Sequence, residues 1–238
     1  MSTSDKGYRH VSFDLWMTLI KSDPVFKLER NGLLRSHFHL QQDETLIGEV
    51  VRKHDLYYNR YNEQTGESVP SDEMWRVILA DLGVEKEAAT KERIADFESK
   101  AEILFYQYPP KLIDEATGDI LYTLHSRGIT LNILSNTGFT KGRLLRRLLN
   151  DWGIGAHFHF QVYSDEVGYS KPHRGIFDAL WSELEKIIPQ GEPVSKDEVL
   201  HIGDNSFADV EGAFAYGFTG KLFCPPTNKL ADCIPKQT

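Results

Sequence analysis

Apolar residues first gather in a short run at 11–13, which ends at Asp14. A short apolar run of this kind, closed by a polar residue, is typical of a buried β-strand. Over 25–108 the apolar residues instead recur mostly at helical spacing, with loop-like interruptions at 62–71 and Gly83. This part of the chain predicts about four or five helices and no strand.

After the proline pair Pro109 and Pro110, helix and strand patterns alternate to the end of the chain. Helices are predicted at 113–126, 141–151, 176–187 and 209–216, and strands at 129–134, 158–163, 199–202 and 217–223. Such alternation is typical of a parallel sheet with helices on both faces. We therefore predict an α/β core that is interrupted near its first strand by a helical insert.

Composition and charge narrow the class of protein. The chain has 238 residues, 40% hydrophobic and 26% charged, as in ordinary globular proteins. A formal net charge of −8 argues against nucleic acid as a partner, because phosphate contacts need clustered positive charge. No apolar run approaches the ~20 residues of a membrane helix, and residues 1–6 lack an apolar signal core. We expect a cytoplasmic protein that binds neither nucleic acid nor membrane.

Polar side chains follow the predicted strands at 11–13, 129–134 and 199–202, and a lysine lies in the loop after 158–163. These side chains are Asp14, Thr18, Ser135, Asn136, Lys171, Asp204 and Asp209. Taken alone, Asp14, the pair Ser135 and Asn136, and Asp204 also fit ordinary turn or helix caps, and Lys171 fits an exposed lysine before a loop proline. The carboxyl ends of parallel strands meet at one edge of a sheet, so we expect the set to converge. Carboxylates that face each other repel unless a cation lies among them, and hard oxygen ligands suit Mg²⁺. The set suggests phosphoryl chemistry.

Histidines do not add a second metal site. His10, the pair His37 and His39, and the pair His157 and His159 are not spaced like the ligands of one ion. We expect these side chains at surfaces.

Four segments, 13–19, 133–136, 164–172 and 201–209, resemble the four ordered motifs of the haloacid dehalogenase-like hydrolase superfamily. Each segment is a weak signal alone, but four in the right order are a strong one. The resemblance implies a Rossmann-like α/β hydrolase core over 1–20 and 109–238. The segment 21–108, between the first two motifs, resembles the inserted α-helical cap domain of that superfamily.

The resemblance assigns roles to the polar residues. Asp14 would attack phosphorus and form an aspartyl phosphate. Ser135 would hold a phosphoryl oxygen, and Lys171 would stabilise negative charge on the nucleophile and the transferring group. Thr18 and Asn136 are expected to contact a small-molecule substrate.

The same resemblance predicts a Mg²⁺ site. Its ligands would be Asp14, Asp204 and the backbone carbonyl of Trp16. Asp209 would support either Lys171 or a metal-bound water.

Trp16 departs from the pattern of the phosphatases, which carry a second Asp two residues after the nucleophile. Indole cannot donate a proton to a leaving alkoxide, a role that is typically worth ~10²–10⁴-fold in rate. The dehalogenase branch has a Tyr at this position, but it lacks the Gly203-Asp204 metal motif. Three alternatives stay open: a Mg²⁺-dependent phosphohydrolase of a small metabolite, a metal-independent 2-haloacid dehalogenase, or a catalytically impaired phosphate-binding relative. The sequence leaves the choice between monomer and homodimer undecided.

Overall fold

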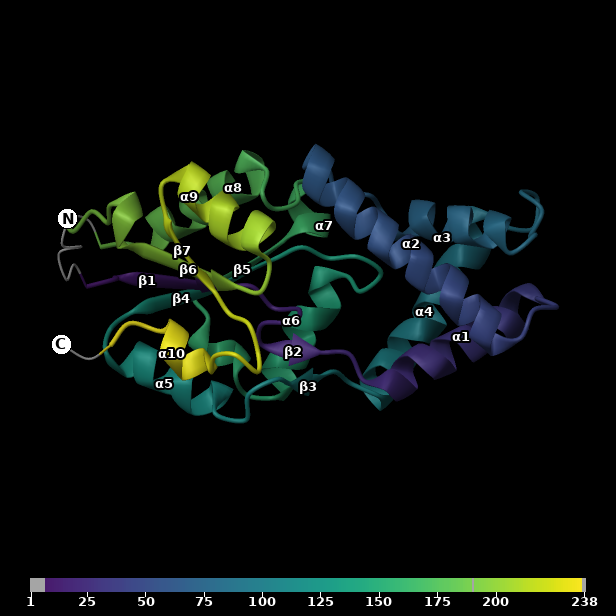
Figure 1. The fold of residues 1–238 in the computed structure, drawn as a ribbon, viewed down its shortest axis with the longest axis horizontal. Coiled ribbons are helices and arrows are strands. Elements are labelled where there is room, and N and C mark those ends of the chain that lie inside the picture. Colours follow the sequence, from purple (N-terminus) through teal and green to yellow (C-terminus); the bar gives the residue numbers. More distant parts are fainter. Residues whose placement is uncertain (1–6, 190, 237–238) are drawn as a thin grey trace.

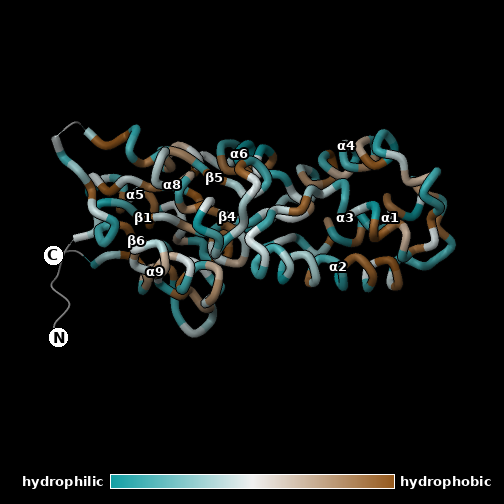
Figure 2. Tube along the Cα trace, turned by 90° about the horizontal axis from the view of Figure 1, so that it is seen from above, coloured by the Kyte–Doolittle hydropathy of each residue, from teal (hydrophilic) through white to brown (hydrophobic). Residues whose placement is uncertain are grey.

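The computed structural model describes residues 7–189 and 191–236, so residues 1–6, where no signal core is expected, lie outside the described part. An α/β core and a group of four helices lie side by side along the long axis of the molecule (Figure 1). Figure 2 shows the same division from a second direction, with the four helices beyond one end of the sheet. Within the described residues, no helix is both long and apolar enough to cross a membrane.

Five parallel strands form the sheet, in the spatial order β5-β4-β1-β6-β7. Their bounds are β1 (His10–Phe13), β4 (Thr130–Ser135), β5 (Phe160–Tyr163), β6 (Val199–Gly203) and β7 (Thr219–Leu222). Every residue of the neighbouring strands β1 and β6 is buried. The first strand of the chain therefore lies in the middle of the sheet, and the parallel α/β prediction is confirmed.

Helices cover both faces of this sheet (Figure 1). On one face, α5 (Thr117–Ser126), α6 (Gly142–Asp151) and α10 (Leu230–Cys233) pack their leucines and isoleucines against alternate residues of β1, β4 and β6. On the other face lie α8 (Arg174–Ile187) and α9 (Gly212–Tyr216). Leu131 and Ile133 face the first group while Leu134 faces the second, as the two-residue period of a strand requires.

Short elements complete the core. They are α7 (Ser164–Val167), the 3₁₀ turns η1 (Gly155–His157) and η2 (Lys196–Glu198), and the π-helical segment η3 (Ser206–Glu211). The two largest differences from the predicted element bounds lie at helix starts. The helix predicted at 113–126 begins at Thr117, and the one predicted at 209–216 begins three residues earlier, in the π-helical segment.

Four helices form the insert: α1 (Pro24–Phe38), α2 (Glu44–Thr65), α3 (Ser71–Asp81) and α4 (Lys91–Gln107). Asp23 caps α1 by accepting a hydrogen bond from the backbone N of Val25 at 2.8 Å, and Pro24 takes the first helical position. The helices bury an apolar cluster of their own, with Trp75 and Phe97 among its largest members. We call this group the cap; its exact boundaries stay a prediction.

The chain passes between the core and the cap twice, and at these two connections a pair of short strands runs antiparallel. They are β2 (Ile20–Lys21) and β3 (Lys111–Leu112). Strands of two residues are too short to leave a periodic pattern, so the sequence did not predict them.

His10 corrects one expectation, because its side chain is fully buried and not at a surface. Its ring nitrogens hydrogen-bond Thr130 Oγ1 at 2.7 Å and Asn132 Oδ1 at 2.8 Å on the neighbouring strand β4. Burial lowers the pKa of His10 to about 4. The ring is therefore a neutral, satisfied core group at neutral pH.

Candidate active site

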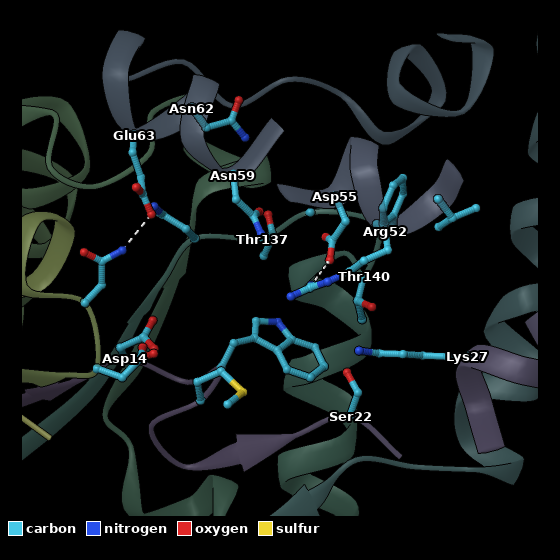
Figure 3. Close-up of a pocket in the computed structure, with 18 of the residues that line it drawn as sticks. Asp14, Ser22, Lys27, Arg52, Asp55, Asn59, Asn62, Glu63, Thr137 and Thr140 are labelled. Carbon is cyan, nitrogen blue, oxygen red and sulfur yellow. Dashed lines mark hydrogen bonds and ion pairs between the residues drawn. The ribbon is translucent and has the colours of Figure 1, made fainter. Parts of the chain in front are cut away.

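A cavity of about 360 Å³ lies between the carboxyl edge of the sheet and the cap. The core lines it with the residue after β1, the segment after β4, Lys171, and the segment after β6. The cap lines it from α1 and α2. In Figure 3, Asp14 lies at one end of the cavity, and Ser22 and Lys27 lie at the other.

Asp14 is held at the sheet edge by the strand geometry, since its backbone N donates to Ile202 O of β6 at 2.9 Å. Three side chains bind its carboxylate. Ser135 Oγ donates to Oδ1 at 3.0 Å, and Thr18 Oγ1 donates to Oδ2 at 3.1 Å. Lys171 Nζ lies 2.9 Å from Oδ1. Burial raises the pKa of Asp14 above its ordinary value, and the charge of Lys171 opposes that rise.

Lys171 is 1% exposed and uses all three donors of its ammonium group. Nζ contacts Asp14 Oδ1 at 2.9 Å, Asp209 Oδ1 at 2.6 Å and the carbonyl of Leu134 at 2.6 Å. Burial alone would lower the pKa of Lys171, but the two carboxylates outweigh it and hold that pKa above its ordinary value. The lysine is a fixed positive charge directly beside Asp14.

Asn136 sets the backbone position of that lysine. Its Oδ1 accepts from Lys171 N at 2.7 Å, and its Nδ2 donates to Lys171 O at 3.0 Å. The side chains of Thr18 and Asn136 thus bind Asp14 and Lys171 in this structure, while their expected contact with substrate stays a prediction.

Asp209 is in direct contact with the lysine and is 1% exposed. Besides Lys171, its carboxylate binds His201 Nε2 at 3.1 Å and accepts from Asn205 N at 2.9 Å. Burial would raise the pKa of Asp209, but Lys171 and His201 hold it well below its ordinary value. Gly203 makes room for this arrangement, since a Cβ at that position would collide with the Asp209 carboxyl group. Asp209 thus contacts Lys171 directly, and its supporting role stays a prediction.

Asp204 follows β6 directly and is the most open of three converging carboxylates. Oxygen atoms of Asp14, Asp204 and Asp209 all lie within 4.8 Å of one another. Burial, together with the charges of Asp14 and Asp209, raises the pKa of Asp204 to about 7. Clustered carboxylates of this kind are relieved by a hard cation with oxygen ligands. The donor set fits a divalent metal ion such as Mg²⁺.

Trp16 lines the cavity beside Asp14 and is half-buried. In the loop after β1, Met17 N donates to Ile20 O at 2.8 Å, and Ile20 N donates to Leu15 O at 2.9 Å. None of the turn and loop hydrogen bonds between described backbone groups uses the carbonyl of Trp16. Met17 carries a positive φ of 59°, a conformation that non-glycine residues adopt rarely.

The cap contributes polar residues that the sequence did not single out. On α2, polar side chains at three- and four-residue intervals line the cavity: Arg52, Asp55, Asn59, Asn62 and Glu63 (Figure 3). Glu63 Oε1 accepts from Asn205 Nδ2 of the core at 2.7 Å, and burial raises the pKa of Glu63. On α1, Lys27, Arg30 and Asn31 line it as well. A polar stripe of this spacing also marks any solvated helix face, so the pattern alone carries no assignment.

Comparison with known proteins places this site in a family context. The family model of haloacid dehalogenase-like hydrolases matches residues 8–217. An uncharacterised hydrolase of Schizosaccharomyces pombe is 25% identical over 206 residues, which cover 85% of this chain and 85% of that protein.

Solved structures of a phosphatase and of a dehalogenase both share the fold of this chain. The magnesium-bound hydrolase YfnB of Bacillus subtilis has a TM-score of 0.65 at 22% identity, with 97% of this chain and 93% of that one covered. A phosphatase from Thermococcus onnurineus has a TM-score of 0.63 at 19% identity, covering 93% and 88%. An L-2-haloacid dehalogenase from Xanthobacter autotrophicus has a TM-score of 0.57 at 20% identity, covering 90% and 76%. At these sequence identities the structural similarity shows the fold alone, and it does not distinguish a phosphatase from a dehalogenase.

Proposed function

The chain belongs to the haloacid dehalogenase-like hydrolase family, and on that premise we propose that it is a Mg²⁺-dependent phosphohydrolase of a small phosphorylated metabolite. One observation carries the proposal. The carboxylates of Asp14, Asp204 and Asp209 converge within 4.8 Å at the sheet edge, and Lys171 binds two of them directly. This combination of nucleophile, fixed cation and oxygen-rich metal ligands suits phosphoryl transfer.

The chemistry follows from the positions of these groups. A carboxylate oxygen of Asp14 attacks phosphorus, the bond from phosphorus to the leaving oxygen breaks, and an aspartyl phosphate forms. The leaving oxygen then takes a proton from solvent. Water attacks the phosphorus of the intermediate, which releases inorganic phosphate and restores the Asp14 carboxylate. Lys171 and Ser135, both bonded to Asp14 Oδ1, hold the nucleophile in one orientation.

The proposed metal ligands are Asp14, Asp204 and the backbone carbonyl of Trp16. Mg²⁺ bound there supplies the positive charge that lets an anionic phosphoryl group approach the carboxylates. Asp209 is already bonded to Lys171 and His201, which suits it to a supporting role and not to direct ligation.

Trp16 narrows the substrate class. Its indole lines the cavity where the family's phosphatases carry a proton donor, so the leaving group must depart without a proton from this position. Acyl and aryl phosphates, whose leaving groups have low pKa values, suffer least. We therefore expect turnover of aryl phosphates to exceed that of alkyl phosphates.

Replacing Trp16 with aspartate tests this limit. We expect Trp16→Asp to raise kcat on an alkyl phosphate by about 10²-fold or more, since general acid catalysis is typically worth ~10²–10⁴-fold. Trp16→Asn is the matched control, because it also removes the indole but supplies no proton. An equal gain in both variants would show that the indole acts only by bulk, and no gain in either would count against an otherwise intact phosphatase site.

Metal binding is testable without activity. Mg²⁺ at about 100 times its Kd should stabilise the protein by about 2.7 kcal/mol in a thermal melt, because it binds only the folded site. Asp204→Asn should abolish most of that stabilisation. Asp119→Asn, on an exposed position of α5 that does not line the cavity, should retain it. An Asp204→Asn protein that keeps the full Mg²⁺ shift would remove Asp204 from the ligand set.

A 2-haloacid dehalogenase is the second candidate, because the dehalogenase branch also has an aromatic residue where this chain has Trp16. Halide leaves without a proton, so indole would do no harm there. Metal-independent halide release from a short 2-haloacid in the presence of chelator would favour this candidate. Phosphate release that requires Mg²⁺ and stops with chelator would favour the phosphohydrolase.

A further inference from the structure

Arg30 lines the cavity and has no role in either proposed reaction. It lies on α1, and its guanidinium carbon is 5.8 Å from the ring centre of Phe26, 5.6 Å from that of Trp75 and 5.7 Å from that of Phe139. Phe26 and Trp75 belong to the cap, while Phe139 belongs to the core segment after β4. Three rings thus hold the guanidinium in place at the boundary of the two parts.

No ion pair or hydrogen bond joins Arg30 to an acidic side chain among the described residues, although the negative charge of Asp55 acts on it from a longer distance. Its Nε is buried without a hydrogen bond, and its one side-chain hydrogen bond, from Nη2 to Asn31 Oδ1, is long at 3.4 Å. The nearby acids are engaged elsewhere: Arg52 binds Asp55 at 2.8 Å, and Lys141 binds Glu98 at 2.8 Å.

An unpaired guanidinium in such a setting is costly unless an anion completes it. Arg30 is half-buried, and a buried N–H donor such as its Nε destabilises the protein when it has no hydrogen-bond partner. Burial lowers the pKa of Arg30 to about 10, so the group still carries its charge at neutral pH. Arg is also the side chain best suited to bind a carboxylate or phosphate through paired N–H donors.

Charged side chains are unevenly distributed along the cavity, with the carboxylate cluster on the core side and cations on α1. Glu63 bonds Asn205 on the core side, near the carboxylate cluster. Lys27, one turn before Arg30 on α1, lines the same cavity, and Figure 3 places it at the end away from Asp14. No described ion pair engages Lys27 either. The α1 side of the cavity therefore offers two cations, the half-buried Arg30 and the exposed Lys27, that form no ion pair among the described residues.

We propose that Arg30, assisted by Lys27, binds a second anionic group of the substrate, a carboxylate or phosphate oxyanion, at the cap end of the cavity. The substrate is then a phosphorylated compound with an anion at each end. This inference rests on the proposed function, since the first anion is the phosphoryl group that Asp14 attacks.

Matched substrates test the second anion site. The probes are two aryl phosphates, 4-carboxyphenyl phosphate and 4-(carboxymethyl)phenyl phosphate, each paired with its carboxamide analogue, which has the same shape and no charge. For at least one pair, kcat/KM of the wild-type protein should be about 10- to 100-fold higher for the acid, the worth of a charge-assisted hydrogen bond. Arg30→Gln should remove this preference by lowering kcat/KM for the acid to about that for the amide. Arg35→Gln, an exposed arginine of the same helix that does not line the cavity, should keep it.

Each outcome either supports or overturns the inference about Arg30. No preference in the wild-type protein, or a preference that survives in Arg30→Gln, overturns the inference and leaves Arg30 as a purely structural cation among rings. If Arg30→Gln does not fold, Arg30→Met fills the space between the rings without a charge and takes its place. If none of the four compounds is hydrolysed, the proposed function fails, and calorimetry with the matching acid and carboxamide arylphosphonates decides the inference. Tighter binding of the acid that depends on Arg30 supports it, and equal or absent binding overturns it.

Discussion

Replacing Asp14 with asparagine should lower the rate of phosphate release from an aryl phosphate by at least about 10³-fold, because the amide cannot form the aspartyl phosphate. The fold should survive the change. Burial raises the pKa of Asp14, so a neutral group of the same shape fits its surroundings well. Lys171 keeps its contacts with Asp209 and Leu134. We expect the free energy of unfolding to change by less than about 1 kcal/mol.

Asp43→Asn is the matched control for Asp14→Asn. Asp43 caps α2 by accepting a hydrogen bond from Leu46 N at 2.9 Å, and Asn caps helices equally well. This variant should keep full activity. A purified Asp14→Asn protein that melts like the wild type and still releases phosphate at an undiminished rate would remove Asp14 as the nucleophile.

The convergence of the site was predictable from sequence because it depends on topology alone. Asp14, Ser135 and Asp204 each follow or close a strand, and parallel strands bring their carboxyl ends to one edge. The strand order was not predictable by the same argument. That order puts β1 between β4 and β6, which is why Ser135 and the segment after β6 both reach Asp14.

The cap half of the site could not be found in the sequence. Arg30 and Glu63 lie on helices with ordinary amphipathic patterns, and their role in the cavity depends on how α1 and α2 dock against the core. Periodicity shows that a residue is on the polar face, but it does not say whether that face meets water or a second part of the molecule.

Buried polar residues inside strands were also missed. His10 is the first residue of β1 and His201 lies in the middle of β6; each is fully buried and hydrogen-bonded to a neighbouring polar side chain. Sequence reasoning assigns histidine to surfaces by default, because only the partner on an adjacent strand makes its burial possible. His201 hydrogen-bonds Asp209, which in turn binds Lys171, so this buried histidine is connected to the lysine through a single side chain.

Replacing Lys171 with methionine is expected to cost both activity and stability. The substitution leaves the carboxylates of Asp14 and Asp209 buried without their shared cation. Removing one partner of a buried ion pair typically costs about 3–5 kcal/mol, so the variant should lose that much free energy of unfolding at neutral pH. Chelator must be present in the measurement, because a divalent cation in the cluster would mask part of the loss.

Lys100→Met is the matched control for this variant. Lys100 pairs with Asp96 at 2.8 Å on the exposed face of α4, where such pairs are worth about 0.3–0.5 kcal/mol. The same change from lysine to methionine should therefore be nearly neutral there. Equal stability losses in the two variants would show that the cost comes from removing any lysine, and that the buried network at Lys171 has no special weight.

The stability loss of the Lys171→Met variant should change with pH in a direction that only the buried network of Asp14, Lys171 and Asp209 predicts. Without the lysine, the folded-state pKa values of Asp14 and Asp209 should lie above their ordinary value of 3.8. A carboxyl whose folded pKa is raised favours folding at acid pH, and that contribution is lost as pH rises through the raised value. The stability deficit against wild type should thus be smaller at about pH 5 than at about pH 8. A deficit that is constant across this range would mean that the two carboxylates do not carry the penalty, and that lost packing of the lysine stem accounts for it.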